Sequence, residues 1–185
     1  MKEEHILMNI LERAETDRLI LRRPRTEDAG AIFSRYANDP EVTRYLSWPR
    51  HTSVEDSKRF IVFSDCEWER WPVGPYLVES KENGLLLGST GLAFESSLRA
   101  STGYVFRKDA WGKGYATEAV RAVVEIGRAA GLTRLYAVCH TVHTASAHVL
   151  EKCGFLREGL LRRHCEFPNL DGRAHNIFHY GFVYE

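Results

Sequence analysis

The stretch that decides the fold of this chain is Val105-Phe106-Arg107-Lys108-Asp109-Ala110-Trp111-Gly112-Lys113-Gly114-Tyr115-Ala116-Thr117-Glu118. It reads as a strand, a tight turn with two glycines, and the start of a long helix over about residues 114–130. The first backbone N–H groups of a helix have no partner inside it, and glycines let an anion reach them without a Cβ in the way. Lys113 adds a positive charge, and the helix dipole adds about 0.3–1 kcal/mol of attraction. The sequence therefore predicts an anion-binding turn.

Short glycine motifs occur in several folds, so the nature of the anion stays open at this point. The phosphate-loop pattern needs four residues between its first Gly and its Gly-Lys pair, and this sequence lacks it. The dinucleotide fingerprint needs a third small residue where Thr117 stands. A nucleotide-binding or dinucleotide-binding enzyme remains an alternative, and so does a helix whose glycines merely allow tight packing.

Strands and helices follow one another on both sides of this turn. Upstream, the patterns predict a strand over residues 18–23, helices that start at Thr26 and Ser53, and strands over 75–80, 85–92 and 101–106. Asn83-Gly84 lies between two of these strands and is a strong hairpin signal. Downstream, they predict a strand over 134–139, a helix over 144–152, and strands over 156–163 and 176–184. This order is typical of an α+β or α/β sheet with helices packed on it.

The composition indicates one globular domain. The chain has 185 residues, of which 44% are hydrophobic and 27% charged, with 25 basic and 25 acidic side chains. A chain of this length can bury a sizeable core in one domain. Because its formal net charge is zero, nothing draws it generally to nucleic acid or to an anionic membrane, and we expect neither as a partner.

The cysteines and histidines suggest neither a disulfide framework nor a metal site. No two of the four cysteines stand as C-x-x-C, and no H-x-x-x-H pair falls in a predicted helix. We therefore expect no bound metal. The cysteines are expected to be thiols in a reducing compartment, and the cytoplasm is the expected location.

Residues 1–15 are expected to form an N-terminal extension that precedes the main domain, residues 16–185. Ile6, Leu7, Ile10 and Leu11 fit a short amphipathic helix, which could dock on the domain or on a second subunit. A homodimer is therefore one expectation. The apolar patch is too short for a secretory signal, and no segment approaches the length of a membrane span.

Four segments follow one another in an order and spacing typical of one protein family. They are Glu15-Thr16-Asp17-Arg18-Leu19-Ile20-Leu21-Arg22, Asn38 to Tyr45, Trp111 to Ala119, and Ser146 followed by Glu151-Lys152-Cys153-Gly154-Phe155. Together they resemble the RimJ/RimL-type branch of the GNAT acetyltransferase superfamily, over about residues 16–184. The resemblance implies a single-domain α+β (α/β) fold. Its mixed seven-stranded sheet would be splayed at the middle, flanked by about four helices, with acetyl-CoA in the gap.

The resemblance also implies which residues bind acetyl-CoA. The turn would hold the pyrophosphate through Gly112, Lys113, Gly114, Tyr115, Ala116 and Thr117. The strand at Val105 and Phe106 would bond the pantetheine arm, and a backbone N–H there would polarise the thioester carbonyl. His143 stands where relatives commonly have Asn, and it would either offer a ring N–H to the cofactor or be a solvated residue at a helix start. Asp109 replaces the Gln or Arg that often opens the turn.

Catalytic roles are harder to assign, because the Tyr that serves as general acid in many relatives is Leu150 here. The resemblance points to Ser146, one helical turn away, as the group that hydrogen-bonds the leaving sulfur. It points to Glu166 as the base. The alternatives are a Ser146 that bonds its own backbone, a Glu166 that is only a surface carboxylate, and a water chain that carries the proton.

The resemblance also implies that the acceptor lies between the first helical pair and the last hairpin, where Tyr45 and Trp48 would line its pocket, with Trp68 as a further candidate. The predicted function is transfer of an acetyl group from acetyl-CoA to an amine by direct attack in a ternary complex. The amine would belong to a protein N-terminus or to a small molecule. The departures at Asp109, His143 and Leu150 leave a non-catalytic acyl-CoA-binding or regulatory module as the alternative.

Overall fold

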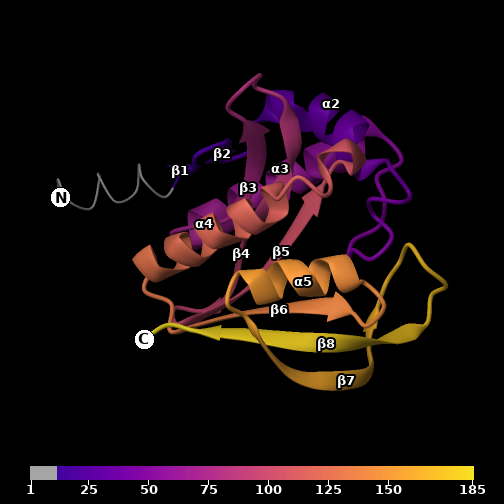
Figure 1. Ribbon diagram of the computed structural model, residues 1–185. Coiled ribbons are helices and arrows are strands. Elements are labelled where there is room, and N and C mark those ends of the chain that lie inside the picture. The colour runs from indigo at the N-terminus through magenta and orange to yellow at the C-terminus, as the bar shows by residue number, and fades with distance from the viewer. Residues whose placement is uncertain (1–11) are drawn as a thin grey trace.

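The computed structural model describes residues 12–185, which form one mixed sheet with helices on both faces (Figure 1). The strands are β1 (Arg13–Glu15), β2 (Leu19–Arg22), β3 (Pro75–Ser80), β4 (Leu86–Ser96), β5 (Arg99–Phe106), β6 (Arg134–His140), β7 (Leu156–Glu166) and β8 (Ala174–Val183). The helices are η1 (Thr26–Asp28), α2 (Ala29–Ile32), η2 (Phe33–Ala37), α3 (Val54–Arg70), η3 (Lys108–Ala110), α4 (Tyr115–Ala129) and α5 (Thr144–Lys152). No helix in this part of the chain combines the length and apolarity needed to cross a bilayer.

The sheet is divided at its middle, between β5 and β6. Its strand order is β1-β2-β3-β4-β5-β6-β8-β7, and β5 and β6 are the one parallel pair among the described strands. Their pairing joins only residues 99–101 to residues 134–136. Beyond these residues the strands diverge, and Figure 1 shows β4 and β5 leaning away from β6 and β8. The predicted splayed α+β sheet is confirmed.

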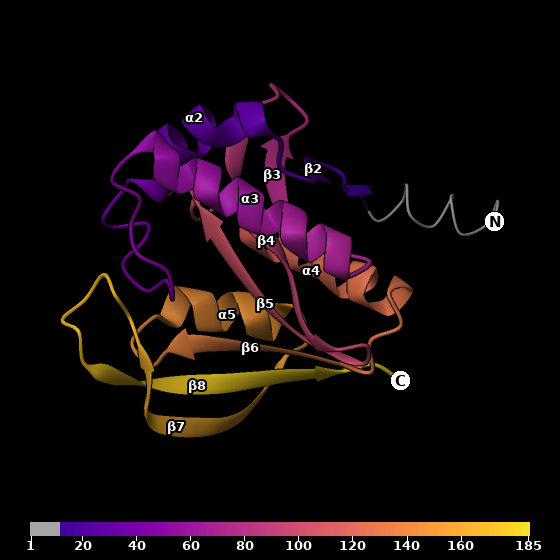
Figure 2. The same cartoon turned by 180° about the vertical axis from the view of Figure 1, so that it is seen from behind.

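Helices cover the two faces of the sheet as two separate layers. α4 and α5 lie on one face, whereas α2 and α3 lie on the other, as the two opposite views show (Figures 1 and 2). Under α4 the core includes Val120 and Val123, both fully buried. A second core beneath α2 and η2 includes Ile32 and Tyr36. The predicted apolar face of the first helix therefore packs on the sheet, although its backbone passes from a 3-10 turn through α-helix to π-helix.

The described sheet has eight strands, one more than predicted. The added strand is β1, which pairs antiparallel with β2 so that Glu15 lies opposite Ile20. The helix expected over residues 1–15 therefore does not include Arg13–Glu15, because their backbone groups pair with β2 instead. The sheet thus begins before residue 16, and residues 1–11 of that expected helix lie outside the described residues.

An ion-pair cluster joins β2 and β3 to the start of the first helical segment. The Arg22 guanidinium donates to both carboxylate oxygens of Asp28, at 2.8 and 2.7 Å, and to Glu79 at 2.5 Å. All three side chains are mostly buried. Burial alone raises the pKa of Asp28, but the bonds from Arg22 and from the Arg25 backbone outweigh it, so this pKa lies below its ordinary value.

We expect Arg22→Met to lower the free energy of unfolding by about 3 kcal/mol, because it leaves two mostly buried carboxylates without their partner. The matched control is Arg13→Met, which removes an exposed pair with Glu15 and should cost less than about 1 kcal/mol. Urea unfolding at pH 7 measures both. Because the pKa of Asp28 is lowered in the folded state, the contribution of Arg22 should fade as pH falls through that value. Equal losses in the two variants would contradict this account.

Candidate active site

The predicted anion-binding turn lies at the amino end of α4. Gly112 and Gly114 have φ angles of 72° and 81°, in the left-handed region that favours glycine, and Gly114 is the N-cap of the helix. The Glu118 N–H bonds the Gly114 carbonyl, which closes the first turn of α4. The N–H groups of residues 115–117 precede that bond and lie at the open end of the helix. The turn therefore offers the donors that an anion requires.

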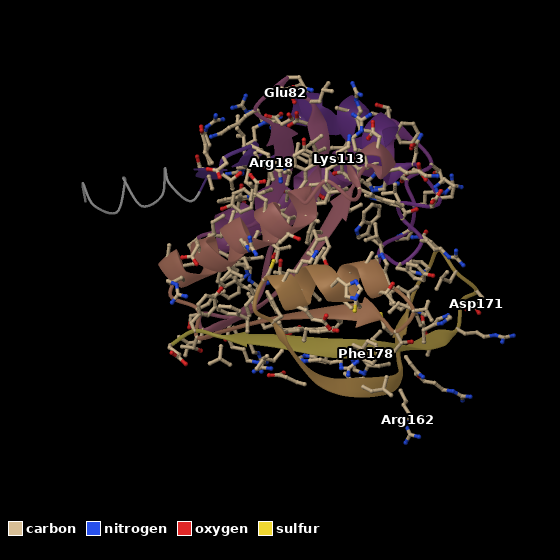
Figure 3. All side chains as sticks on the ribbon, in the orientation of Figure 1. Arg18, Glu82, Lys113, Arg162, Asp171 and Phe178 are labelled. Atoms are coloured by element: carbon tan, nitrogen blue, oxygen red, sulfur yellow. The ribbon has the colours of Figure 1, made fainter. Side chains whose placement is uncertain are left out.

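A carboxylate on α4 holds this turn to the amino-terminal strands. Glu118 accepts hydrogen bonds from the Thr16 hydroxyl at 2.6 Å, and from the backbone N–H and guanidinium of Arg18 at 2.9 and 2.7 Å. Arg18 also donates to the Lys113 carbonyl at 3.0 Å, and Figure 3 shows these two residues side by side. Burial raises the pKa of Glu118, but the bonds from Thr16 and Arg18 leave it below its ordinary value. The first family-like segment contains Thr16 and Arg18, but no role could be predicted for either of them from the sequence.

The edge of β5 that leads into the turn faces the gap. Val105 and Phe106 bury their side chains in the core. The Phe106 carbonyl accepts a hydrogen bond from the Trp111 indole N–H at 2.7 Å, so Trp111 folds back on the end of the strand. Because β6 has diverged, residues 102–106 of β5 pair with no residue of β6 in the described sheet. That edge can bond an extended ligand.

Ser146 faces β5 across the gap, where Tyr104 reaches it. The Tyr104 hydroxyl lies 2.9 Å from both the Oγ and the carbonyl oxygen of Ser146. Burial raises the pKa of Tyr104 well above its ordinary value, so the hydroxyl keeps its proton at neutral pH. Leu150, one turn further along α5, is buried in the core. Sequence analysis missed Tyr104, because only the divergence of β5 and β6 shows that it faces α5.

A cavity of about 510 Å³ opens where β6 ends. It lies between the loop after η2 and the loop that joins β7 to β8, where the acceptor is expected. Its lining includes Arg44, Tyr45, His140, Asn169, Asp171 and His175.

Tyr45 connects this cavity to α5. Its ring centroid lies 5.0 Å from that of His140 and 4.9 Å from that of His143. His143 is the N-cap of α5, and its carbonyl accepts the N–H of Ser146. Burial lowers the pKa of both His140 and His143, so both rings are neutral at pH 7. A continuous path of contacts therefore runs from the cavity to the gap.

The side chains of the other expected acceptor and base residues do not line this cavity. Trp48 packs its side chain against the core beneath α2, and Trp68 is buried with its indole N–H bonded to the Pro75 carbonyl. Glu166 is exposed at the end of β7, one residue past the partner of His175. Strand alternation therefore turns Glu166 to the opposite face of the hairpin. The roles of Trp48 and Glu166 stay predictions.

Asn169 holds the two loops of the cavity together. Its side-chain N–H groups donate to the carbonyls of Thr43 and Trp48 at 2.8 and 2.9 Å, and its Oδ1 accepts the Arg50 N–H at 2.7 Å. One amide thus satisfies three backbone groups of the opposite loop. Nothing in the local sequence indicates a contact between segments so far apart.

Within residues 12–185, no group of three or more His, Cys, Asp or Glu side chains is arranged to hold a metal ion. The four cysteines, all of which are described, are free thiols.

A splayed sheet beside an anion-binding helix end, with a cavity where β6 ends, suits an enzyme that transfers a group from an anionic carrier to a separate acceptor. Residues 18–156 match the acetyltransferase (GNAT) domain family, so the chain belongs to this family of acetyltransferases. The predicted family and enzyme class are confirmed.

Relatives of known sequence and structure agree with this assignment. The chain is 36% identical over 158 residues to the uncharacterized N-acetyltransferase YoaA of Bacillus subtilis (strain 168). The matched region covers 81% of this chain and 86% of YoaA. The structure of RimL, a ribosomal L7/L12 alpha-N-protein acetyltransferase, in complex with coenzyme A has a TM-score of 0.83 at 18% identity, covering 93% of this chain and 98% of RimL. The structure of the microcin C7 self-immunity acetyltransferase MccE in complex with acetyl-CoA and AMP has a TM-score of 0.82 at 20% identity, covering 91% of this chain and 94% of MccE. These two structures show a shared fold.

Two substitutions at Asn169 should distinguish the contribution of its two N–H donor bonds from that of its Oδ1 acceptor bond. We expect Asn169→Ala to remove the protection of the Arg50 amide against hydrogen exchange, and to lower stability by about 1–3 kcal/mol. Asn169→Asp keeps the oxygen that accepts from Arg50, so that amide should stay protected although the two donor bonds are lost. The His51 amide, which bonds the Ala37 carbonyl, is the internal control. Unchanged exchange at Arg50 in Asn169→Ala would show that another group holds the loop.

Proposed function

We propose that this acetyltransferase moves an acetyl group from acetyl-CoA to an amine, by direct attack within a ternary complex. The observation that carries the proposal is the open edge of β5 beside the glycine turn of α4. A gap of this kind suits a long ligand with an anionic group at one end. Solved structures of the same fold that bind acetyl-CoA or coenzyme A support this choice of donor.

The residues around the gap fit the parts of acetyl-CoA. The diphosphate would bond the N–H groups of residues 112–117, where space is available: a Cβ at Gly112 would meet no atom within 4 Å. The positive charges of Lys113 and Arg18 would lie nearby. The pantetheine arm would pair with β5 near Val105 and Phe106, and His143 could donate a ring N–H from the start of α5. When bound, acetyl-CoA supplies an activated thioester.

Positioning accounts for most of the expected rate. Holding an amine in line with a thioester can contribute about 7–11 kcal/mol, whereas one acid or base supplies about 10²–10⁴-fold. Ser146 would donate a hydrogen bond to the leaving sulfur. Tyr104, which donates to the Ser146 carbonyl and lies 2.9 Å from Ser146 Oγ, would hold the serine in place. This pair takes over the role that Leu150 cannot fill.

The acceptor would enter the cavity of about 510 Å³ and lie against Tyr45. A peptide N-terminus and a small-molecule amine both suit such a space. RimL is named as a ribosomal L7/L12 alpha-N-protein acetyltransferase and MccE as a microcin C7 self-immunity acetyltransferase, so the fold is found in acetyltransferases of different named roles. Four free thiols favour a reducing compartment, and we place the reaction in the cytoplasm.

Release of free thiol from acetyl-CoA, measured with a panel of amines and peptide N-termini, tests the proposal directly. We expect turnover with at least one member of the panel. Binding of coenzyme A without turnover on any acceptor would favour the non-catalytic module instead. Absence of binding would reject the proposed donor.

Gly114→Asp should weaken coenzyme A binding at least tenfold, because it places bulk and negative charge in the turn at a left-handed φ. The matched control is Gly131→Asp at the opposite end of α4. Gly131 has a φ of 79°, so the backbone strain is similar, and a Cβ there would meet no atom within 4 Å, whereas one at Gly114 would touch the Arg18 guanidinium at 3.4 Å. Calorimetry should find coenzyme A affinity within about twofold of the wild type for Gly131→Asp. Equal weakening in both variants would place the diphosphate elsewhere.

Ser146→Ala should lower kcat by about 10²-fold or less, with little change in the KM for acetyl-CoA. Tyr104→Phe removes the hydroxyl that bonds Ser146 but keeps the buried ring, and should lower kcat by a similar or smaller factor. The double variant should be no slower than the slower single variant, because the two hydroxyls act as one unit. Additive losses would separate their roles, and an unchanged kcat for Ser146→Ala would remove Ser146 from the mechanism.

A further inference from the structure

Three side chains that line the cavity of about 510 Å³ are joined in a hydrogen-bonded chain. His140 Nε2 lies 3.1 Å from His175 Nδ1, and His175 Nε2 lies 2.7 Å from Asp171 Oδ1. At the other end, the Val142 N–H lies 3.2 Å from His140 Nδ1. The three residues come from β6, β8 and the loop between β7 and β8, where Figure 3 shows Asp171. All three line the cavity.

The bonds at the ends of the chain fix the position of every proton in it. The Val142 N–H can only donate, so His140 Nδ1 is an acceptor and the neutral His140 ring carries its proton on Nε2. That proton is donated to His175 Nδ1. The proton of His175 is therefore on Nε2, from which it is donated to the Asp171 carboxylate. One arrangement of protons satisfies all three bonds.

The surroundings keep His140, at one end of this hydrogen-bonded chain, neutral and keep Asp171, at the other end, anionic. His140 is 8% exposed, and its ring packs against Phe167 as well as Tyr45. Burial, followed by the nearby His175 and Arg44, lowers the pKa of His140. The bonds from His175 and from the Arg173 backbone lower the pKa of Asp171.

The titratable and charged groups around His140 come from four parts of the fold. They are Arg44 and Tyr45 from the loop after η2, His143 from the start of α5, His175 from β8, and Asp171 with Arg173 from the loop between β7 and β8. Asp171 is the one carboxylate among these neighbours. A proton taken up by the two histidines would therefore be stabilised mainly by Asp171.

We propose that His140, His175 and Asp171 form a proton relay that deprotonates the acceptor amine. This inference rests on the proposed acetyl transfer and names the group that accepts the proton. His140 is the catalytic residue. Its Nδ1 accepts the Val142 N–H in the free protein, and it would exchange this hydrogen bond for the proton of the bound ammonium. His175 and Asp171 are positioning residues, which act through His140.

The proton balance of the step is complete. As His140 Nδ1 gains the ammonium proton, its Nε2 proton passes to His175 Nδ1, which leaves an imidazolium beside Asp171. The neutral amine attacks the thioester carbonyl carbon, the C–S bond breaks, and the second proton of the nitrogen reaches the departing sulfur through Ser146. After the product leaves, the same shift runs backwards and gives the stored proton to water in the cavity.

Glu166 is the competing base, and the two candidates lie in different places. The relay lines the cavity, whereas Glu166 is exposed on the other face of the hairpin. His179 supplies a matched control, because it lies on the same strand as His175 and also pairs with a carboxylate, Glu158, but lies outside the cavity.

The decisive variant is Asp171→Asn, which keeps an oxygen that can accept from His175 but removes the charge. We expect the acid limb of the kcat/KM profile to move to lower pH by about one unit, because the protonated relay loses its counter-charge. We expect kcat to fall about tenfold, with the KM for acetyl-CoA unchanged. Glu166→Gln and His179→Gln should leave the acid limb in place.

Nitrogen NMR of the imidazole rings gives a readout that needs no turnover. In the free protein at pH 8, both His140 and His175 should carry the proton on Nε2. A proton on Nδ1 of either ring would overturn the relay, as would an unmoved acid limb in Asp171→Asn or a moved limb in Glu166→Gln alone. Absence of turnover in the wild type would instead reject the proposed acetyl transfer, and the relay with it.

Discussion

β5 and β6 pair over only three residues on each strand, and the arrangement of the site depends on this divergence. A sheet normally pairs the backbone groups of neighbouring strands, and groups left unpaired must be satisfied by solvent or ligand. Here residues 102–106 of β5 face a gap instead of a strand. The same divergence leaves room for Tyr104 of β5 to reach Ser146 of α5, and their hydroxyl oxygens lie 2.9 Å apart. One interruption of pairing therefore creates both a binding edge and the contact across it.

The helix end beside this gap is held in place before any ligand arrives. Glu118 accepts hydrogen bonds from the Thr16 hydroxyl and the Arg18 guanidinium, and Arg18 donates to the carbonyl of Lys113 within the turn. A carboxylate so close to an anion site would repel the ligand, but the bonds from Arg18 offset its charge. The chain as a whole carries no net charge, so the attraction for an anion comes from this local arrangement of dipoles and cations.

Periodic segments and the glycine turn could be predicted from the sequence, because their signals are local. α4, β8 and the hairpin at Asn83-Gly84 all belong to this class. β1 has only three residues and leaves no periodic signal. Tyr104, Asn169 and the histidine chain escaped prediction because their partners are distant in sequence. The face on which Glu166 lies could not be predicted either. The register of β7 is irregular between Leu161 and Cys165, and such a shift changes the face of every later side chain.

The two ends of the site differ in how they respond to protons. At the glycine turn, where we propose that the carrier binds, the donors are backbone N–H groups, and the titratable neighbours stay in one state near neutral pH: the pKa of Glu118 is lowered and that of Tyr104 is raised. At the cavity where we propose that the acceptor binds, the groups are histidines, whose ordinary pKa lies close to neutrality. Binding of the carrier should therefore vary little with pH, whereas the state of the amine and of its base should vary strongly. This division follows from the reaction, since an acetyl donor needs a fixed cradle and an ammonium must lose a proton before it can attack.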